Sequence, residues 1–315
     1  MRSKQSTSHI MMIRPKAFGY NEETAANNSY QQAPDGTSPS EISEKAIEEF
    51  DAFADQLKRA GVDLIVIEDT EKPVKPDAVF PNNWISFHDE NVLITYPMFS
   101  PKRREERREE IIEALDQSFV IDRRYAFEFG EEKDHFLEGT GSMVLDRMNK
   151  IVYACLSPRT NIKMLDRFCL LMGYSKVVFH AVDESGEPIY HTNVVMALGT
   201  EFAVICLEAI PDADEQKKVR EQLERTGKTV IDINYQQLND FAGNMLEVKT
   251  DSGDTLIVMS DTAYHSLDPD QLKALSNFGS IIHPAIPTIE KYGGGSVRCM
   301  MAEVFLDECN SGEAE

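Results

Sequence analysis

The stretch Gly293-Gly294-Gly295-Ser296-Val297-Arg298-Cys299-Met300-Met301-Ala302-Glu303-Val304-Phe305-Leu306 joins three glycines to a single cysteine and then to an apolar run. Glycines let the backbone bend sharply and let another group approach it closely. We therefore expect the thiol of Cys299 to lie at an accessible junction between a loop and a strand. Because a lone cysteine is more often a buried structural residue, a functional interpretation depends on the rest of the chain.

The composition is typical of a globular protein, with 42% hydrophobic and 27% charged residues. The 315 residues are enough to bury a large core, and 54 acidic against 32 basic residues give a formal net charge of -22. Such a charge repels phosphate backbones and anionic lipid surfaces. We therefore expect neither nucleic acid nor a membrane as a partner.

The five cysteines form no CxxC pair and no disulfide framework, a pattern typical of a reducing compartment. No apolar run approaches the roughly 18 residues that a membrane span needs. The apolar patch Ile10-Met11-Met12-Ile13 is too short for a signal peptide. We expect a cytoplasmic protein, either a monomer or a homodimer.

A unit of helix, short apolar strand, polar loop and two further apolar strands recurs along the chain. Expected strands follow glycines at residues 62–67, 176–179, 229–233 and 281–283, and Asp116-Gln117-Ser118 at residues 119–121. The junctions between polar loop and strand carry Asn83, Glu138, His191, Asn244 and Cys299, at intervals of 55, 53, 53 and 55 residues. A nearly constant period of this size indicates a radial or stacked repeat.

Five such units closed into a ring would bring these five side chains together on its axis. We therefore predict one α/β domain over residues 10–309, with flexible termini at 1–9 and 310–315. The outer helices are expected at 101–117, 157–172, 211–226 and 264–277, with Pro158 and Pro211 at first helical positions. A further helix, capped by Ser40 or Ser43, should end at Gly61. Residues 15–39 lack periodicity and should be disordered or functional, for instance a lid.

A thiol, an imidazole and a carboxylate in one pocket suit nucleophilic catalysis at an electrophilic carbon. Cys299 would attack as the thiolate, His191 would transfer protons, and Glu138 would orient the imidazole or the substrate nitrogen. The histidines lack metal-ligand spacing, and the triple glycine does not match a nucleotide-binding loop. We therefore expect no metal and no cofactor.

The chain resembles the pentein superfamily of guanidino-group-modifying enzymes over nearly its whole length. The clearest local similarity is to the dimethylarginine dimethylaminohydrolases, at residues 76–83, 137–141 and 156–161, at His191 and at Cys299. The resemblance implies a five-bladed ββαβ propeller with helices outside and the active site on the central axis. It also implies a small amino-acid substrate.

The resemblance further implies the roles of individual residues. Cys299, His191 and Glu138 would be the catalytic group, and Asp77 would bind the amino-acid part of the substrate or form the pocket wall. Arg159 and Arg103 would bind the substrate α-carboxylate, since a planar guanidinium fork suits that group. Arg104 is an equal candidate to Arg103.

Asparagines replace carboxylates of the related enzymes at Asn82, Asn83 and Asn193, and Gly141 and Ser142 stand where an aspartate is usual. A guanidinium needs carboxylate partners in a dry pocket, whereas an amide offers donors and an acceptor to a neutral ureido group. This favours hydrolysis of citrulline to ornithine, ammonia and carbon dioxide through a covalent Cys299 adduct.

Residues 18–24 and 81–84 also resemble the citrulline-utilisation hydrolases, which are amidinotransferase-like. Succinylarginine dihydrolases have asparagine-lined sites too, so the amides leave an arginine-type substrate open. One alternative is a deiminase, dimethylaminohydrolase or amidinotransferase acting on an arginine derivative. Another is a pentein without catalysis, similar to the ribosome anti-association factor, which predicts no reactive thiol.

Overall fold

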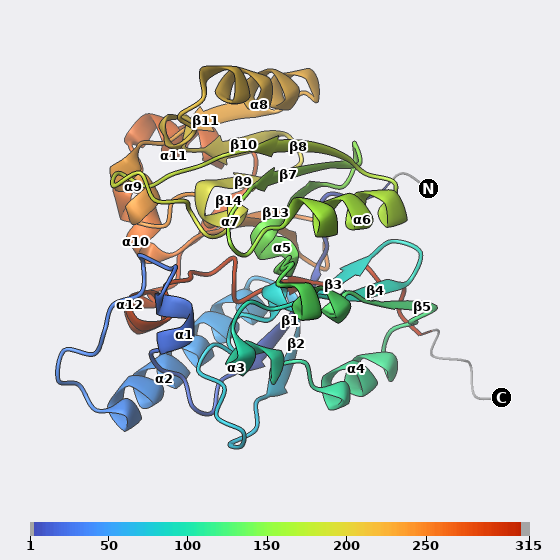
Figure 1. The fold of residues 1–315 in the computed structure, drawn as a ribbon, viewed down its shortest axis with the longest axis vertical. Coiled ribbons are helices and arrows are strands. Elements are labelled where there is room, and N and C mark those ends of the chain that lie inside the picture. Colours follow the sequence, from blue (N-terminus) through green and yellow to red (C-terminus); the bar gives the residue numbers. More distant parts are fainter. Residues whose placement is uncertain (1–2, 310–315) are drawn as a thin grey trace.

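The computed structural model describes residues 3–309 and consists of five three-stranded sheets with helices around the outside (Figure 1). In every sheet the middle strand runs antiparallel to one neighbour and parallel to the other. A parallel pair needs a long crossover connection, and each of these sheets meets that need with helical structure. The predicted α/β propeller with outer helices is confirmed.

The first sheet contains β15 (Ala302–Glu303), β1 (His9–Arg14) and β2 (Asp63–Glu68). The next two are β3 (Ile85–His88), β4 (Val92–Thr95) and β5 (Arg123–Ala126), then β6 (Val144–Asp146), β7 (Ile151–Cys155) and β8 (Ser175–Phe179). The last two are β9 (Met196–Leu198), β10 (Phe202–Ile205) and β11 (Thr229–Asp232), then β12 (Leu246–Lys249), β13 (Thr255–Val258) and β14 (Ser280–Ile282).

The crossover helices lie between the second and third strand of each sheet. They are α1 (Glu22–Ala25) with α2 (Pro39–Arg59), α3 (Pro101–Arg104) with α4 (Glu109–Asp116), α6 (Ile162–Met172), α8 (Ala213–Arg225), and α10 (Asp261–Ser266) with α11 (Pro269–Ser276). Shorter helical segments occupy other connections: η1 (Pro81–Asn83), η2 (Glu128–Lys133), α5 (Gly139–Ser142), α7 (Thr192–Val195), η3 (Leu207–Ala209), α9 (Tyr235–Asn239) and α12 (Pro287–Gly293).

The first sheet is assembled from both ends of the chain. Strand β15 pairs antiparallel with β1, with Met11 opposite Ala302, and the amide of Val304 donates to the carbonyl of His9 at 2.9 Å. On its other edge β1 pairs in parallel with β2. The ring is therefore closed by the strand that directly follows Cys299.

The helix boundaries differ from the predicted ones where local hydrogen bonding ends a helix early. The expected helices 101–117 and 264–277 are each two helices, and the 157–172 helix begins only at Ile162 because Asn161 caps it. Asp212 caps α8, so neither Pro158 nor Pro211 is a first helical residue. Ser38, not Ser40 or Ser43, caps α2, whose end is followed by Gly61 at φ +87°.

Two further predictions are wrong. Residues 119–121 do not form the third strand of the second sheet, since β5 begins at Arg123. Of the termini expected to be flexible, residues 5–7 are buried, and the side chain of Gln5 donates to the carbonyl of Leu145 at 2.8 Å. The expected flexible residues 310–315 and 1–2 lie outside the described residues.

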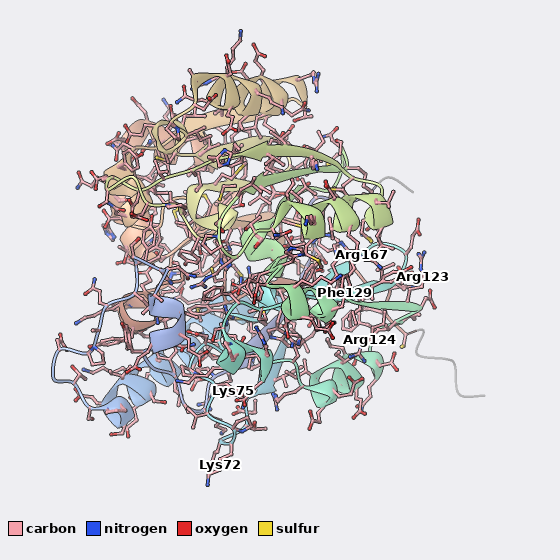
Figure 2. All side chains as sticks on the ribbon, in the orientation of Figure 1. Lys72, Lys75, Arg123, Arg124, Phe129 and Arg167 are labelled. Atoms are coloured by element: carbon pink, nitrogen blue, oxygen red, sulfur yellow. The ribbon has the colours of Figure 1, made fainter. Side chains whose placement is uncertain are left out.

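The periphery of the propeller carries paired charges. Figure 2 shows Arg123 and Arg124 of β5 at the edge of the molecule, where they pair with Glu90 and Glu109. Within residues 3–309, no helix combines the length and apolarity that a membrane crossing requires.

The ring closure predicts the effect of trimming the core beneath β1. Met11 is 0% exposed and packs with Ala302 and Val304, so Met11→Ala should lower the free energy of unfolding by about 2–5 kcal/mol in chemical denaturation. Met148→Ala is the matched control, because Met148 is 47% exposed, and it should change stability by less than about 0.5 kcal/mol. Equal effects of the two substitutions would contradict this closure.

Candidate active site

The five residues expected on the axis all precede the first strand of a blade. Asn83 ends η1 before β3, while Glu138 and His191 are the residues just before α5 and α7. Asn244 lies in the turn before β12, and Cys299 lies in the turn before β15. All five are buried. The repeat phase therefore places these side chains at equivalent points around the centre.

Glu138 and His191 form a buried pair at the centre of the site. Nε2 of His191 lies 2.8 Å from Oε2 of Glu138, and the amide of Phe99 donates to Oε1 at 2.9 Å. Burial alone would raise the pKa of Glu138, but Arg159, His191 and Arg103 outweigh it and lower that pKa to about 2. Since a carboxylate accepts, the imidazole donates its Nε2–H.

The same burial acts on the imidazole in the other direction. Burial lowers the pKa of His191 from its usual 6.5 to about 4 and outweighs the opposing effect of Glu138. At neutral pH the ring is therefore uncharged, with the lone pair on Nδ1. That state suits a general base.

Cys299 is 3% exposed and lies among amide groups. The Nδ2 atoms of Asn193 and Asn244 each lie 3.4 Å from its sulfur. Oδ1 of Asn244 also accepts from the amide of Arg298 at 3.1 Å, which holds that side chain in place. Two N–H donors directed at one sulfur can stabilise negative charge on it.

A small cavity joins the thiol to the imidazole. Its volume is about 20 Å³, which is room for about one water molecule. Its walls are Thr24, Asn28, Asp77, Phe80, Asn83, Arg103, Arg159, Tyr190, His191, Gly293, Gly294, Gly295 and Cys299. In this conformation the site is closed to a molecule the size of an amino acid.

The segment expected to be a lid or disordered is ordered and covers this cavity. Nδ2 of Asn28 donates to the carbonyl of Gly294 at 3.2 Å, and the side chain of Gln31 donates to the carbonyl of Tyr292 at 2.9 Å. Asn21, which caps α1, donates to Asp77 at 2.7 Å. Residues 21–31 therefore bridge the glycine loop and the opposite cavity wall.

Arg159 contributes its guanidinium to the cavity from below this cover. Its Nε donates to Oδ1 of Asn27 and its Nη2 to the carbonyl of Thr24, both at 2.8 Å. Nη1 lies 3.6 Å from Glu138, and the group sits 4.7 Å from the ring centre of Tyr190. The cover thus supplies oxygen acceptors to an arginine that lines the cavity.

Arg103 is held mainly by other parts of the protein. It makes a two-bond pair with Glu106, at 2.8 and 2.9 Å, and donates from Nη1 to Oδ1 of Asn83 at 2.8 Å. The alternative candidate Arg104 does not line the cavity and donates to the carbonyls of Met98 and Phe99. Two carboxyl groups near Arg103 have raised pKa values. Burial raises the pKa of Asp77. Burial, together with the neighbouring Asp77 and Glu138, raises the pKa of Glu106 to about 7 although Arg103 lowers it.

The predicted amide residues do not all face the cavity. Asn82 lies outside its lining and donates to Oγ1 of Thr140 at 3.2 Å, so the expectation that it faces the substrate pocket is not met. Asn193 reaches the sulfur instead of the cavity wall. Asn83 does line the cavity, and its buried Nδ2 has no hydrogen-bond partner among the described residues.

A group with metal-ligand spacing occurs elsewhere. His9, Asp63 and Glu308 bring one potential ligand atom each within 4.8 Å of the others. None of the three lines the cavity of Cys299, and His9 uses separate ring nitrogens toward the two carboxylates.

The sequence matches the family described as "N,N dimethylarginine dimethylhydrolase, eukaryotic" over residues 14–306. The chain belongs to this family. It is a pentein hydrolase of the kind that modifies guanidino groups, which agrees with the thiol, imidazole and carboxylate gathered here. No curated protein matches the sequence.

Solved structures share the fold. The N-terminal domain of ArgZ, an arginine dihydrolase from cyanobacteria, superposes with a TM-score of 0.72 at 16% identity, covering 95% of this chain and 98% of that one. AgrE with L-arginine gives 0.72 at 15% identity, covering 96% of this chain and 41% of AgrE. A dimethylarginine dimethylaminohydrolase adduct gives 0.63 at 16% identity, covering 94% and 98%.

Several residues around the cavity were missed in the sequence. Glu106 lies three residues after Arg103, a spacing that signals a helical ion pair, but nothing local shows that the pair is buried. Thr24, Asn27 and Asn28 lie in a segment without periodicity, so their approach to Arg159 and Gly294 follows only from the fold. The sequence placed Asn244 on the axis but did not predict its contact with the sulfur of Cys299.

The packing around Gly141 predicts a severe effect of adding one methyl group. A Cβ there would lie 2.4 Å from Nδ2 of Asn83 and 2.7 Å from Nδ1 of His191. Gly141→Ala should therefore displace one of these groups and lower kcat/KM by about a hundredfold or more. Gly19→Ala is the control, since a Cβ at Gly19 meets no atom within 4 Å. Full activity of Gly141→Ala would show that the close packing is unnecessary.

The low pKa of His191 predicts how stability depends on pH. The folded value of about 4 lies below the usual 6.5, so the unfolded state binds more protons between these values and stability falls as pH falls. The stability advantage of the wild type over His191→Gln should shrink by roughly 2 kcal/mol between about pH 7 and about pH 5. Chemical denaturation at each pH measures this, and a constant difference would refute a buried neutral imidazole.

Proposed function

We propose that residues 10–309 act as one catalytic domain that hydrolyses arginine to ornithine, with citrulline as an intermediate and as a substrate in its own right. The observation that carries this proposal is the amide of Asn83. Its Nδ2 is a buried donor without a partner among the described residues, in the same cavity as Cys299 and His191. Such a donor matches the oxygen of a ureido group, which a guanidinium lacks.

In the first cycle, Cys299 attacks the guanidinium carbon while His191 takes the thiol proton. The imidazolium then returns that proton to a terminal nitrogen, the C–N bond breaks and ammonia leaves. Water attacks the resulting thiol adduct with His191 as base, the C–S bond breaks, and citrulline remains. Glu138 keeps the imidazole oriented and stabilises its charged form.

In the second cycle, the sulfur attacks the ureido carbon, and Nδ2 of Asn83 donates to the oxygen as negative charge develops on it. His191 protonates the δ-nitrogen, and ornithine leaves. Water then cleaves the S-carbamoyl adduct, and the released carbamic acid decomposes to ammonia and carbon dioxide. The proposed steps use only side chains of this protein and water.

Arg159 and Asp77 are assigned to the amino-acid end of the substrate. Arg159 would exchange its contacts with Asn27 and Thr24 for the α-carboxylate, and Asp77 would bind the α-ammonium group. Because the cavity holds only about 20 Å³, the cover at residues 21–31 must move before substrate binds. Asn193 would donate a hydrogen bond to the sulfur of Cys299. Asn82 would hold the segment Gly139-Thr140-Gly141 in place through its hydrogen bond to Thr140.

The relatives support this assignment. ArgZ is described as an arginine dihydrolase from the ornithine–ammonia cycle, and mutants of its N-terminal domain were solved bound to substrate and covalently bonded to a reaction intermediate. A mutant of AgrE was solved in a binary complex with L-arginine. Dimethylarginine hydrolysis is the second candidate, favoured by the family match.

Turnover assays on arginine, citrulline and dimethylarginine test the proposal. The wild type should release ornithine from both arginine and citrulline, and Cys299→Ser should lower both rates by about a thousandfold or more. Cys309→Ser is the control, because Cys309 is exposed. Arginine converted only to citrulline would indicate a deiminase, dimethylarginine alone would indicate the second candidate, and no turnover with an unreactive thiol would indicate a binding protein.

A further inference from the structure

Glu106 is a buried carboxylate that the proposed chemistry does not use. We infer that Glu106 and Arg103 form a positioning pair that fixes the amide orientation of Asn83, and that this pair thereby favours the ureido step over the guanidinium step. The inference rests on the proposed function and adds a residue to it. Neither residue of the pair needs to touch the reacting carbon.

The contacts form a chain from the α3–α4 connection to the cavity. Glu106, 2% exposed, accepts two hydrogen bonds from Nε and Nη2 of Arg103. Those two bonds hold the guanidinium plane, which then donates from Nη1 to Oδ1 of Asn83 at 2.8 Å and from Nη2 to the carbonyl of Phe80 at 3.0 Å. The guanidinium group is planar and its donors have fixed directions, so little side-chain freedom is lost for each hydrogen bond that forms. Arg103 held by Glu106 is therefore a rigid support for Asn83.

The direction of the Asn83 amide follows from the chemistry of its partner. A guanidinium offers donors and no acceptor, so only the oxygen of Asn83 can face Arg103. Its nitrogen then faces the other way, where it lies beside Nδ1 of His191 next to Gly141. A flipped amide would instead present an acceptor to the cavity.

That orientation distinguishes the two substrates. The terminal nitrogens of a guanidinium are all donors, so they cannot accept a hydrogen bond from Nδ2 of Asn83. A ureido oxygen, and the negative oxygen formed when sulfur attacks, both accept from Nδ2 of Asn83. The donor therefore adds stabilisation to the ureido step that the guanidinium step does not receive. Loss of the fixed orientation should therefore harm citrulline more than arginine.

Glu106→Gln tests the inference because it keeps the size of the side chain and removes one acceptor of the fork. We expect kcat/KM for citrulline to fall by about tenfold or more, with a change below about threefold in the first ammonia released from arginine. Citrulline should accumulate during arginine turnover. Glu105→Gln is the matched control, since Glu105 is exposed on the same turn, and it should behave as the wild type.

Two further variants separate positioning from simple loss of structure. Arg103→Met with Glu106→Leu removes both charges without leaving one unpaired, and the variant should unfold cooperatively. Because Arg103 lines the cavity, both rates should fall, but the ratio of the citrulline rate to the arginine rate should fall as it does in Glu106→Gln. Asn83→Asp replaces the amide with a group that has no orientation to fix, so adding Glu106→Gln to it should not change the ratio of the two rates further.

The outcomes distinguish this inference from the proposed function. Equal losses for both substrates in Glu106→Gln, or an unchanged ratio in the folded double variant, would overturn the positioning role while the wild type still converts arginine to ornithine. A wild type that turns over neither substrate would overturn the proposed function and this inference together.

Discussion

The antiparallel pairing of β15 with β1 is the contact on which the rest of the site depends. Cys299 lies three residues before β15, so the pairing of Met11 with Ala302 fixes where the sulfur sits. The other reactive groups come from different blades, and no short-range interaction brings them to the sulfur. Closure of the ring converts residues separated by 53 or more positions in sequence into neighbours around one small cavity.

Electrostatics then determines which states those neighbours adopt. Burial opposes charge in the cavity, and the ionisable groups there all have polar partners: Glu138 with His191 and Arg159, Arg103 with Glu106, and Asp77 with Asn21. The same burial keeps His191 uncharged.

Much of this architecture could be predicted from the sequence, and the limits have physical causes. The period of the polar junctions identified the five blades and the residues on the axis, because each blade must cover its own apolar face with the same succession of elements. The predicted helix boundaries were less accurate. The helices α6 and α8 begin after the capping residues Asn161 and Asp212, not at the prolines from which their starts were predicted. The turning of Asn82 away from the cavity and the burial of Glu106 depend on contacts between blades, which no local pattern encodes.

The closed cover also determines how the sulfur meets its chemical environment. Residues 21–31 and Gly293 to Gly295 lie beside the small cavity that Cys299 lines, and the thiol is only 3% exposed. In this conformation, access to the sulfur is limited by the size of that cavity as well as by the intrinsic reactivity of a thiol. Bulky oxidants and disulfides in solution therefore have little access to the sulfur while this segment stays in place.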